Sequence, residues 1–512
     1  MRMSPTPKSD IFTYADFDLQ ALCRQASTLR QGLLCACDPD QRPASGSFNW
    51  AIFLSFKDGV RWVFRSPHPR TFMPIEMGEK LLASEAATLR YLRAHSDIPV
   101  PDVYHYCASA HNEIGIPFIL MSEAPGRPLS KFWRPTGSPQ PSLETPSKAK
   151  ILSQLGSITW KLTQVRFDKI GSLFEEDESF SIKECLSRGH MLHERCFLKI
   201  PRGPFASEAD FYDSLISAFS KHAEILQLSH HCFVAPVPSQ NDYPSSVQYE
   251  SAVDLWSDFV TIGCKIDSSV NRLDYIIAGD ALRDIIHKFP AINPKTFPLC
   301  HPDLSVNNIY VDDNYNITCI IDWAFTSSIP ESMLLTTPGL PQYRDEISSE
   351  LHIPFIDGFF AAMPKSTDER SAHRYRQSLE QSQVSWRLSR LLSLDSIGDF
   401  TLFATVWHFA YGPEQNLMQY FLHQRRSTHY IRLYSEAQQE DLPVSKIEED
   451  EKDYFRNKDL RKTIAKKLTL MSEWNAQYTD RHPPKLRKDM FVASPNLWKW
   501  IQELIQDWEG MS

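Results

Sequence analysis

Residues 300–323, CHPDLSVNNIYVDDNYNITCIIDW, place side chains able to do chemistry around two apolar runs. His301 and Asp303 precede the first run, Asn308 begins it, and Asp322 ends the second. Two extended runs joined by a short turn form an antiparallel hairpin, so Asn308 and Asp322 should be neighbours at its open end. Their oxygens suit a hard cation such as Mg²⁺, and Asp303 adds a second carboxylate that can meet a substrate proton.

The five residues between the two runs, Asp312 to Asn316, are mostly turn formers and are predicted to be a turn only. A calcium loop starting at Asp312 would need glycine at its sixth position and an acid at its twelfth. Those positions hold Ile317 and Trp323, which excludes that type of site.

The pattern H-x-D-x4-N followed by I-I-D-W resembles the catalytic loop and metal-binding motif of the aminoglycoside phosphotransferase family, which has a kinase-like fold. Protein kinases usually carry lysine two residues after the catalytic aspartate, where this chain has Ser305. Trp323 and Ala324 also replace the Phe-Gly that follows the metal-binding aspartate of protein kinases. Both differences favour the small-molecule branch of the fold.

The resemblance implies a role for each motif residue. Asp303 would orient the acceptor hydroxyl and take its proton, and His301 would brace the loop by hydrogen bonding. Asn308 and Asp322 would hold Mg²⁺ on the phosphates of ATP. The implied cofactors are therefore ATP and Mg²⁺.

A nucleotide would need a site before the hairpin. Residues 48–66 are predicted to form two strands around the turn Asp58-Gly59. The kinase-like fold places its phosphate-covering loop at the start of the first strand, where this chain has Ser45, Gly46 and Ser47. A single glycine also fits an ordinary turn.

Helix periodicity over 76–95 gives an apolar stripe with Glu85 in its middle. A buried carboxylate needs a partner, and the fold supplies a basic residue on the preceding strand, here Arg65. The family more commonly has lysine there, and arginine differs from it in bulk and in its forked geometry. The alternative is that Glu85 reaches solvent at the edge of the helix.

Two further segments extend the resemblance to about 45–330. FILMSEAPGRPL (118–129) resembles the last strand and hinge of the family, where backbone groups around Glu123 would face adenine. FDKIGSL (167–173) resembles a segment of fungal members.

The order of elements, strands with one helix and then mostly helices, predicts an α+β, bilobal, protein-kinase-like fold. We expect a small β-rich N-lobe and a large helical C-lobe, with helices near 148–162, over 271–288, through most of the chain after 345, and from Ser494. The predicted parts are an N-terminal helical extension (1–44), the N-lobe (45–125), the C-lobe core (126–345) and a helical C-terminal part (346–512).

Composition excludes several classes. The net charge of −9 over 512 residues argues against a nucleic-acid or anionic-membrane partner. No apolar run approaches the roughly 20 residues of a membrane helix, and the N-terminus resembles neither a signal nor a transit peptide, so we expect a cytoplasmic protein. Ten scattered cysteines are expected to be reduced and mostly buried.

The leading hypothesis is an ATP- and Mg²⁺-dependent kinase that phosphorylates a hydroxyl of a small molecule. A pseudokinase that binds nucleotide and acts as an interaction protein is the alternative, because Arg65 and the poor glycine loop depart from the family pattern. A protein kinase ranks third. The acceptor and the oligomeric state cannot be read from the sequence.

Overall fold

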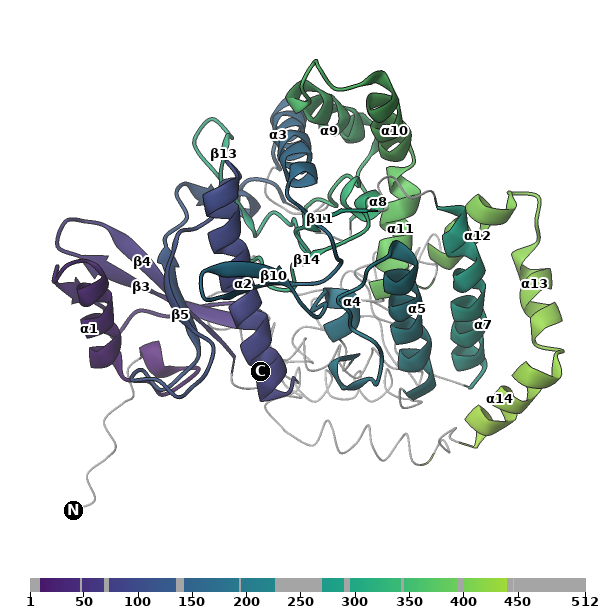
Figure 1. The fold of residues 1–512 in the computed structure, drawn as a ribbon, viewed down its shortest axis with the longest axis horizontal. Helices are drawn as coiled ribbons and strands as arrows, with labels where there is room; N and C mark the ends of the chain where they lie inside the picture. Colours follow the sequence, from purple (N-terminus) through teal and green to yellow (C-terminus); the bar gives the residue numbers. More distant parts are fainter. Residues whose placement is uncertain are drawn as a thin grey trace, which may run out of the picture. The chain divides into compact units, whose positions relative to one another are not determined.

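The computed structural model (Figure 1) describes residues 10–439 except for 47, 69–72, 135–141, 193–194, 226–268, 290–294, 342–344, 394–399 and 401, and also describes residue 445. The chain forms two compact units. One combines residues 1–218 with 287–393, and the other combines 219–286 with 394–512. All the candidate site residues belong to the first unit. This division differs from the predicted domain ranges, which stay predictions.

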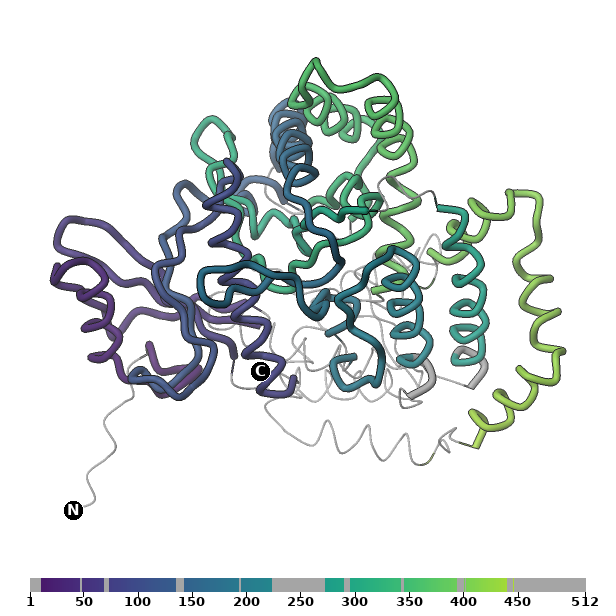
Figure 2. The backbone as a smooth tube through the Cα atoms, in the orientation of Figure 1, coloured from purple at the N-terminus to yellow at the C-terminus, as the bar shows by residue number. Residues whose placement is uncertain are grey.

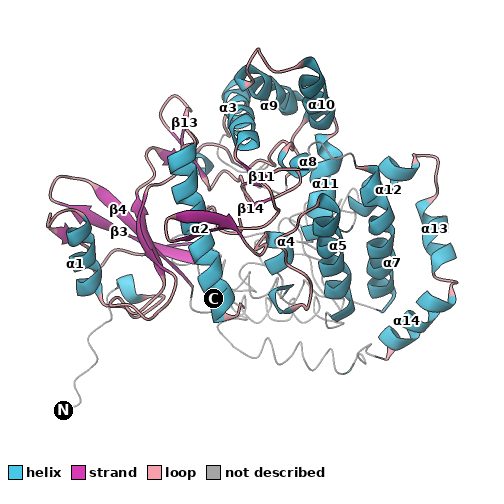
Figure 3. Cartoon of the chain, viewed as in Figure 1, coloured by secondary structure: helices cyan, strands magenta, loops and turns pink. Residues whose placement is uncertain are grey.

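A six-stranded antiparallel sheet begins the first unit (Figure 3). Its strands are β1 (Cys35–Ala36), β2 (Ala44–Ser45), β3 (Asn49–Phe56), β4 (Arg61–Pro67), β5 (Val103–Cys107) and β6 (Phe118–Ser122). They run in the order β1-β3-β4-β6-β5, and β2 also pairs with β3. The predicted turn at Asp58-Gly59 joins β3 to β4, because the Phe56 amide donates to the Val60 carbonyl at 2.9 Å.

Two helices cover the sheet. Helix α1 (Leu19–Leu29) shares an apolar cluster with Trp50, Phe64 and other inward-facing residues of the strands. Side chains alternate along a strand, so Arg65 on β4 faces away from this cluster. It faces α2 (Ile75–His95) instead, which places a basic side chain against the buried side of that helix.

A three-stranded sheet connects this region to the motif residues. Its strands are β7 (Arg127–Pro128), β12 (Ile309–Val311) and β13 (Ile317–Ile320), and β12 lies in the middle. The Ile320 amide also donates to the Pro99 carbonyl at 2.8 Å. The backbone of the hairpin therefore runs beside the segment that follows α2, although the two are far apart in sequence (Figure 2).

Short elements lie between the longer strands and helices. They are η1 (Asp10–Phe12) before the sheet, then η2 (Leu129–Lys131), β8 (Arg166–Phe167), β9 (Leu173–Glu176), β10 (Ser179–Ile182), α4 (Arg188–Met191), η3 (Arg195–Phe197), η5 (Ile286–Lys288), β11 (Phe297–Cys300), β14 (Ser327–Ser328) and α8 (Glu331–Leu334). Strand β11 pairs with β8 and β14 and leads directly into His301.

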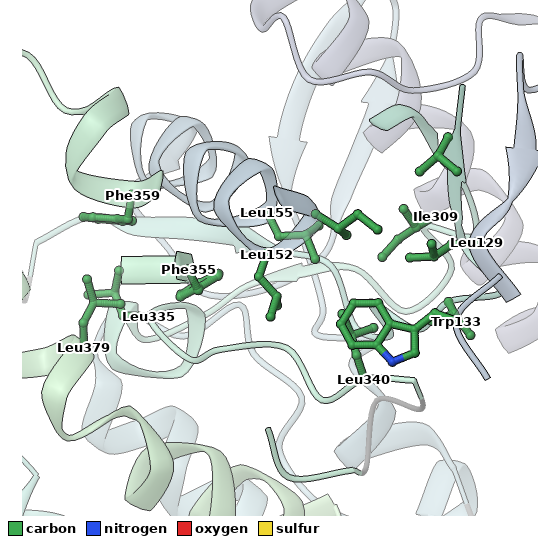
Figure 4. Packing of buried hydrophobic residues seen from close by; sticks show 13 residues of the cluster. Leu129, Trp133, Leu152, Leu155, Ile309, Leu335, Leu340, Phe355, Phe359 and Leu379 are labelled. Carbon is green, nitrogen blue, oxygen red and sulfur yellow. The ribbon is translucent and has the colours of Figure 1, made fainter. Parts of the chain in front are cut away.

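The longer helices of the first unit are α3 (Thr145–Gln164), α9 (Ser349–Ala362), α10 (Glu369–Glu380) and α11 (Ser382–Ser393). Leu155 of α3, Phe355 of α9 and Ile309 of the hairpin share one buried cluster (Figure 4). Helices α3 and α9 come very close, because a Cβ on Gly156 would overlap the Phe355 carbonyl oxygen. This core packs against the hairpin and holds it in place.

The second unit contains α7 (Ser269–Ile285), α12 (Phe403–Tyr411), α13 (Leu417–Gln424) and α14 (Thr428–Gln438). Helix α5 (Glu208–Ile225) begins in the first unit and ends in the second. Arg425 binds the carboxylate of Asp274 with hydrogen bonds of 2.6 and 2.7 Å. The Tyr430 hydroxyl donates to Asp280 at 2.8 Å.

The predicted α+β fold class is confirmed, with a β-rich N-terminal region followed by mainly helical chain. Two details differ from the prediction. The stretch 1–44 holds the short strand β1 and the first residue of β2 in addition to its helices. Helix α3 begins at Thr145, three residues before the predicted start near 148. The helix predicted from Ser494 lies outside the described residues.

The cysteines also differ from the prediction. All eight that the structure describes are free thiols, but only three of them are buried. Cys23 on α1 and Cys35 on β1 contact each other through their side chains. Burial of most thiols was therefore the wrong expectation for the described part of the chain.

Candidate active site

The open end of the hairpin brings the motif residues together. The Ile321 amide donates to the Asn308 carbonyl at 2.9 Å, so Asn308 lies beside the residue that precedes Asp322. The Asn308 side-chain amide donates to the Asp303 carbonyl at 2.9 Å. This bond uses Nδ2 and makes Oδ1 the Asn308 atom able to ligate a cation. The predicted neighbourhood of Asn308 and Asp322 is therefore present in the structure.

His301 connects the loop to the second strand. Its Nδ1 accepts the backbone N–H of Asp303 at 3.0 Å, so the proton is on Nε2, which donates to the Ile321 carbonyl at 3.0 Å. The ring packs edge-on against Trp323, with centroids 4.6 Å apart. Burial lowers the pKa of His301 to about 4, so the ring is neutral at pH 7. Through these two hydrogen bonds, His301 holds the backbone of Asp303 against the second strand.

Arg65 joins two carboxylates. Its Nη1 binds Glu85 and its Nη2 binds Asp322. The Glu85 side chain is only 4% exposed, so it does not reach solvent. Burial alone would lower the pKa of Arg65, but the two carboxylates outweigh it and raise that pKa. Burial raises the pKa of Glu85, and the charge of Arg65 opposes the rise.

Asp322 lies at the accessible end of this ion-pair network. Its side chain is 41% exposed, and its φ of +64° is a left-handed conformation that aspartate tolerates better than most residues. Mg²⁺ is usually held by one or two protein oxygen ligands together with phosphate and water. The carboxylate of Asp322 and the amide oxygen of Asn308 fit that requirement chemically.

A pocket lies against Arg65. Phe48, Asn49, Arg65, Pro67, Met73, Gly78, Leu81, Leu82, Glu85, Ile119 and Ala324 line it. The predicted phosphate loop connects β2 to β3. Phe48, at the end of this connection, lines the pocket. Ser45 pairs with Trp50 across this connection, and the Gly46 amide donates to the Asn49 carbonyl at 2.8 Å. Ser47 lies outside the described residues.

Glu123 follows β6, in the connection to β7. Its carboxylate pairs with Arg61 on β4 at 3.1 Å, and both side chains are substantially exposed. The side chain is therefore directed to a surface ion pair, and only backbone groups of this segment would be available for a nucleotide base. Glu123 thus lies in the connection between the two sheets, and the predicted contact of its backbone with adenine stays a prediction.

Sequence reasoning missed Arg188. Its Nη1 lies 3.6 Å from Oδ2 of Asp303. Arg188 is the first residue of α4 and belongs to no motif. Neither spacing nor periodicity in the sequence pointed to it, because only tertiary packing brings α4 to the loop.

Part of the chain matches a known protein family. Residues 41–219 match the model of the phosphotransferase enzyme family, APH. The predicted resemblance to this family is thereby confirmed over residues 41–219. The matched range includes Arg65 and Glu85, whereas the hairpin lies beyond it.

Individual relatives are more distant. A subtelomeric hrmA-associated cluster protein of Aspergillus fumigatus is 26% identical over 351 residues, which cover 64% of this chain and 65% of that protein, slightly less than two thirds of its length. The altered inheritance of mitochondria protein 9, mitochondrial, of Candida tropicalis is 34% identical over 99 residues, which cover 19% of this chain and 16% of that protein. The ethanolamine kinase of Plasmodium vivax has 12% identity and a TM-score of 0.37, with 74% of this chain and 81% of that chain covered.

Within the described ranges, no helix has both the length and the apolar character needed to cross a membrane.

Proposed function

From the match of residues 41–219 to the phosphotransferase enzyme family, we propose that this protein transfers the γ-phosphoryl group of ATP to a hydroxyl of a small molecule. The observation that carries the proposal is the bridge that Arg65 forms between Glu85 and Asp322. It links a basic residue of the sheet, an acid of α2 and the acid that ends the hairpin. Kinase-like enzymes hold ATP phosphates with such a strand cation and helix carboxylate.

Each residue of the chain has a distinct task in this proposal. Arg65 supplies positive charge to the nucleotide phosphates and is itself held by Glu85. Asn308 and Asp322 are the residues that would hold Mg²⁺, which neutralises phosphate charge when bound. These groups act mainly by positioning the phosphates and by balancing their charge.

Asp303 acts on the acceptor. Its carboxylate accepts a hydrogen bond from the acceptor hydroxyl, orients its oxygen toward the phosphoryl group, and takes its proton as the new P–O bond forms. His301 fixes the backbone of Asp303 through the bond to its N–H. Because His301 stays neutral, it does not compete for that proton.

The test uses calorimetry and turnover together. ATP binding is measured with Mg²⁺ and with a chelator, and ADP release is measured against amino alcohols, sugars and aminoglycosides. We expect Asp303→Asn to abolish transfer and to retain Mg²⁺-dependent ATP binding. We expect Asp322→Ala to weaken the binding itself.

Asp313→Asn is the matched control, because Asp313 lies in the same hairpin but at its turn, where its side chain is 87% exposed. This variant should behave like the unmodified protein in both assays. Near-normal transfer by Asp303→Asn would exclude the catalytic role. Equal ATP binding with and without Mg²⁺ would exclude the metal role of Asp322.

A further inference from the structure

Arg188 provides a second cation at the candidate site, on the side of Asp303. Arg188 Nη1 lies 3.6 Å from Asp303 Oδ2, and the two side chains are 17% and 21% exposed. This separation is that of an ion pair and is longer than a charge-assisted hydrogen bond. Their exposed fractions leave both side chains partly accessible to a ligand.

The helix that carries Arg188 is packed into the site. Met191 and Leu192, at and just after the end of α4, share a buried cluster with Phe325, which follows Asp322 by three residues. Phe48, which follows the predicted phosphate loop, packs against the same cluster, and its ring centroid lies 5.2 Å from that of Phe325. Packing of this kind fixes the helix and directs Arg188 toward the loop.

The charges of the reacting groups explain why a cation is needed at the position of Arg188. A transferring phosphoryl group carries negative charge on its three equatorial oxygens. Asp303 must lie close to that group to orient the acceptor, and its own negative charge opposes the approach. The loop from His301 to Asn308 contains no lysine or arginine. The cation on this side comes from α4 instead.

We propose that Arg188 pairs with Asp303 in the resting protein and binds an oxygen of the transferring phosphoryl group during the reaction. This inference rests on the proposed function. The bond from phosphorus to the leaving ADP oxygen breaks, the bond to the acceptor oxygen forms, and the acceptor proton passes to Asp303. Arg188 stays protonated throughout and only donates hydrogen bonds.

A positioning role that acts only through Asp303 is the competing explanation. Aluminium fluoride with Mg²⁺ and ADP imitates the phosphoryl group in transfer and requires no acceptor. The test compares the affinity for Mg²⁺·ADP with the affinity for Mg²⁺·ADP·aluminium fluoride, measured by calorimetry. The proteins compared are the unmodified chain, Arg188→Gln, Arg188→Lys, and Asp303→Asn with and without Arg188→Gln.

We expect Arg188→Gln to weaken the aluminium fluoride complex roughly 100-fold, as loss of a single oxyanion donor does, and to change Mg²⁺·ADP affinity by less than about twofold. Arg188→Lys should recover part of the loss because it keeps the charge. In the Asp303→Asn background, Arg188→Gln should still weaken the complex. Arg387→Gln is the control for removing a paired arginine, since Arg387 binds Glu346 elsewhere in the same unit.

Unchanged affinity for the aluminium fluoride complex in Arg188→Gln would overturn the inference and leave the proposed function standing. So would an effect that vanishes in the Asp303→Asn background, because Arg188 would then act only through Asp303. Failure of the unmodified protein to bind Mg²⁺·ADP would overturn both the proposed function and this inference. Circular dichroism of Arg188→Lys and Arg188→Gln verifies that the compared proteins are folded.

Discussion

Arg65 and Asp322 lie 257 residues apart in sequence and form an ion pair through Nη2 and Oδ1. The same guanidinium holds Glu85 with its other terminal nitrogen. A residue of the first sheet is thereby fixed at once to the helix that packs on the sheet and to the hairpin that ends at Asp322. The three side chains act as one charged unit, and their replacement should be strongly non-additive.

Removing Arg65 alone should be costly for stability. Arg65→Met leaves the buried carboxylate of Glu85 without its counter-charge, and breaking a buried pair in this way costs about 3–5 kcal/mol. The free energy of unfolding, measured by chemical denaturation, should fall by that amount. The double variant Arg65→Met with Glu85→Leu should recover most of the loss, because no unpaired charge remains buried.

A matched control is Arg61→Met, because Arg61 lies on the same strand as Arg65 and its pair with Glu123 is exposed. Exposed pairs contribute only about 0–1 kcal/mol, so little change is expected. If the double variant Arg65→Met with Glu85→Leu were as unstable as Arg65→Met alone, that result would contradict the ion-pair argument.

Arg65→Lys tests the forked geometry separately from the charge. Lysine is a single point charge and cannot hold two carboxylates in the parallel manner of a guanidinium. We expect Arg65→Lys to retain Mg²⁺-dependent ATP binding. The Mg²⁺ concentration for half-maximal binding should fall, because lysine would compete less with Mg²⁺ for the Asp322 carboxylate. Calorimetric ATP titrations at a series of Mg²⁺ concentrations measure this. A higher Mg²⁺ requirement in the variant would show that Arg65 does not compete for Asp322.

The site residues differed in how far the sequence could identify them. His301, Asp303, Asn308 and Asp322 are local to one hairpin, so strand alternation and turn chemistry were enough to place them together. Glu85 was identified because a charge interrupts an apolar stripe, which demands a partner.

Arg188 gave no such signal. The α4 segment is four residues long and too short for helical periodicity to be measured. Its position depends on side-chain packing around Phe325, which no local pattern encodes. The division of the helical chain into two units escaped prediction for the same reason, since each helix looks alike whichever core it joins.

The close approach of α3 and α9 gives a prediction for the core that packs against the hairpin. Gly156→Ala would force a methyl group into the Phe355 carbonyl, and overpacking of this kind costs about 1–3 kcal/mol. Gly78→Ala is the matched control on α2, where a Cβ would meet no atom within 4 Å. That change should stabilise the helix by roughly 0.5–1 kcal/mol. Opposite shifts in thermal unfolding temperature are expected, and equal shifts would rule out the close crossing.

His301 predicts how stability depends on pH. Its pKa is lowered by burial to about 4 in the folded protein, against an ordinary value of about 6.5 in the unfolded chain. Between these values the unfolded chain binds a proton that the folded protein does not. The free energy of unfolding should therefore fall as pH decreases from about 6.5 to about 4, by up to about 1.4 kcal/mol per pH unit from this group.

His301→Asn removes this contribution and keeps an oxygen that can accept the Asp303 N–H. The variant should be less stable than the unmodified protein at pH 7, because the hydrogen bond to the Ile321 carbonyl is lost. The difference in unfolding free energy should shrink as pH is lowered toward 5, since only the unmodified protein must keep a buried imidazole neutral. Denaturation curves at several pH values measure that difference. A difference that is constant with pH would mean that the pKa of His301 is the same in the folded and unfolded states, so that folding does not hold the ring neutral as a brace for Asp303.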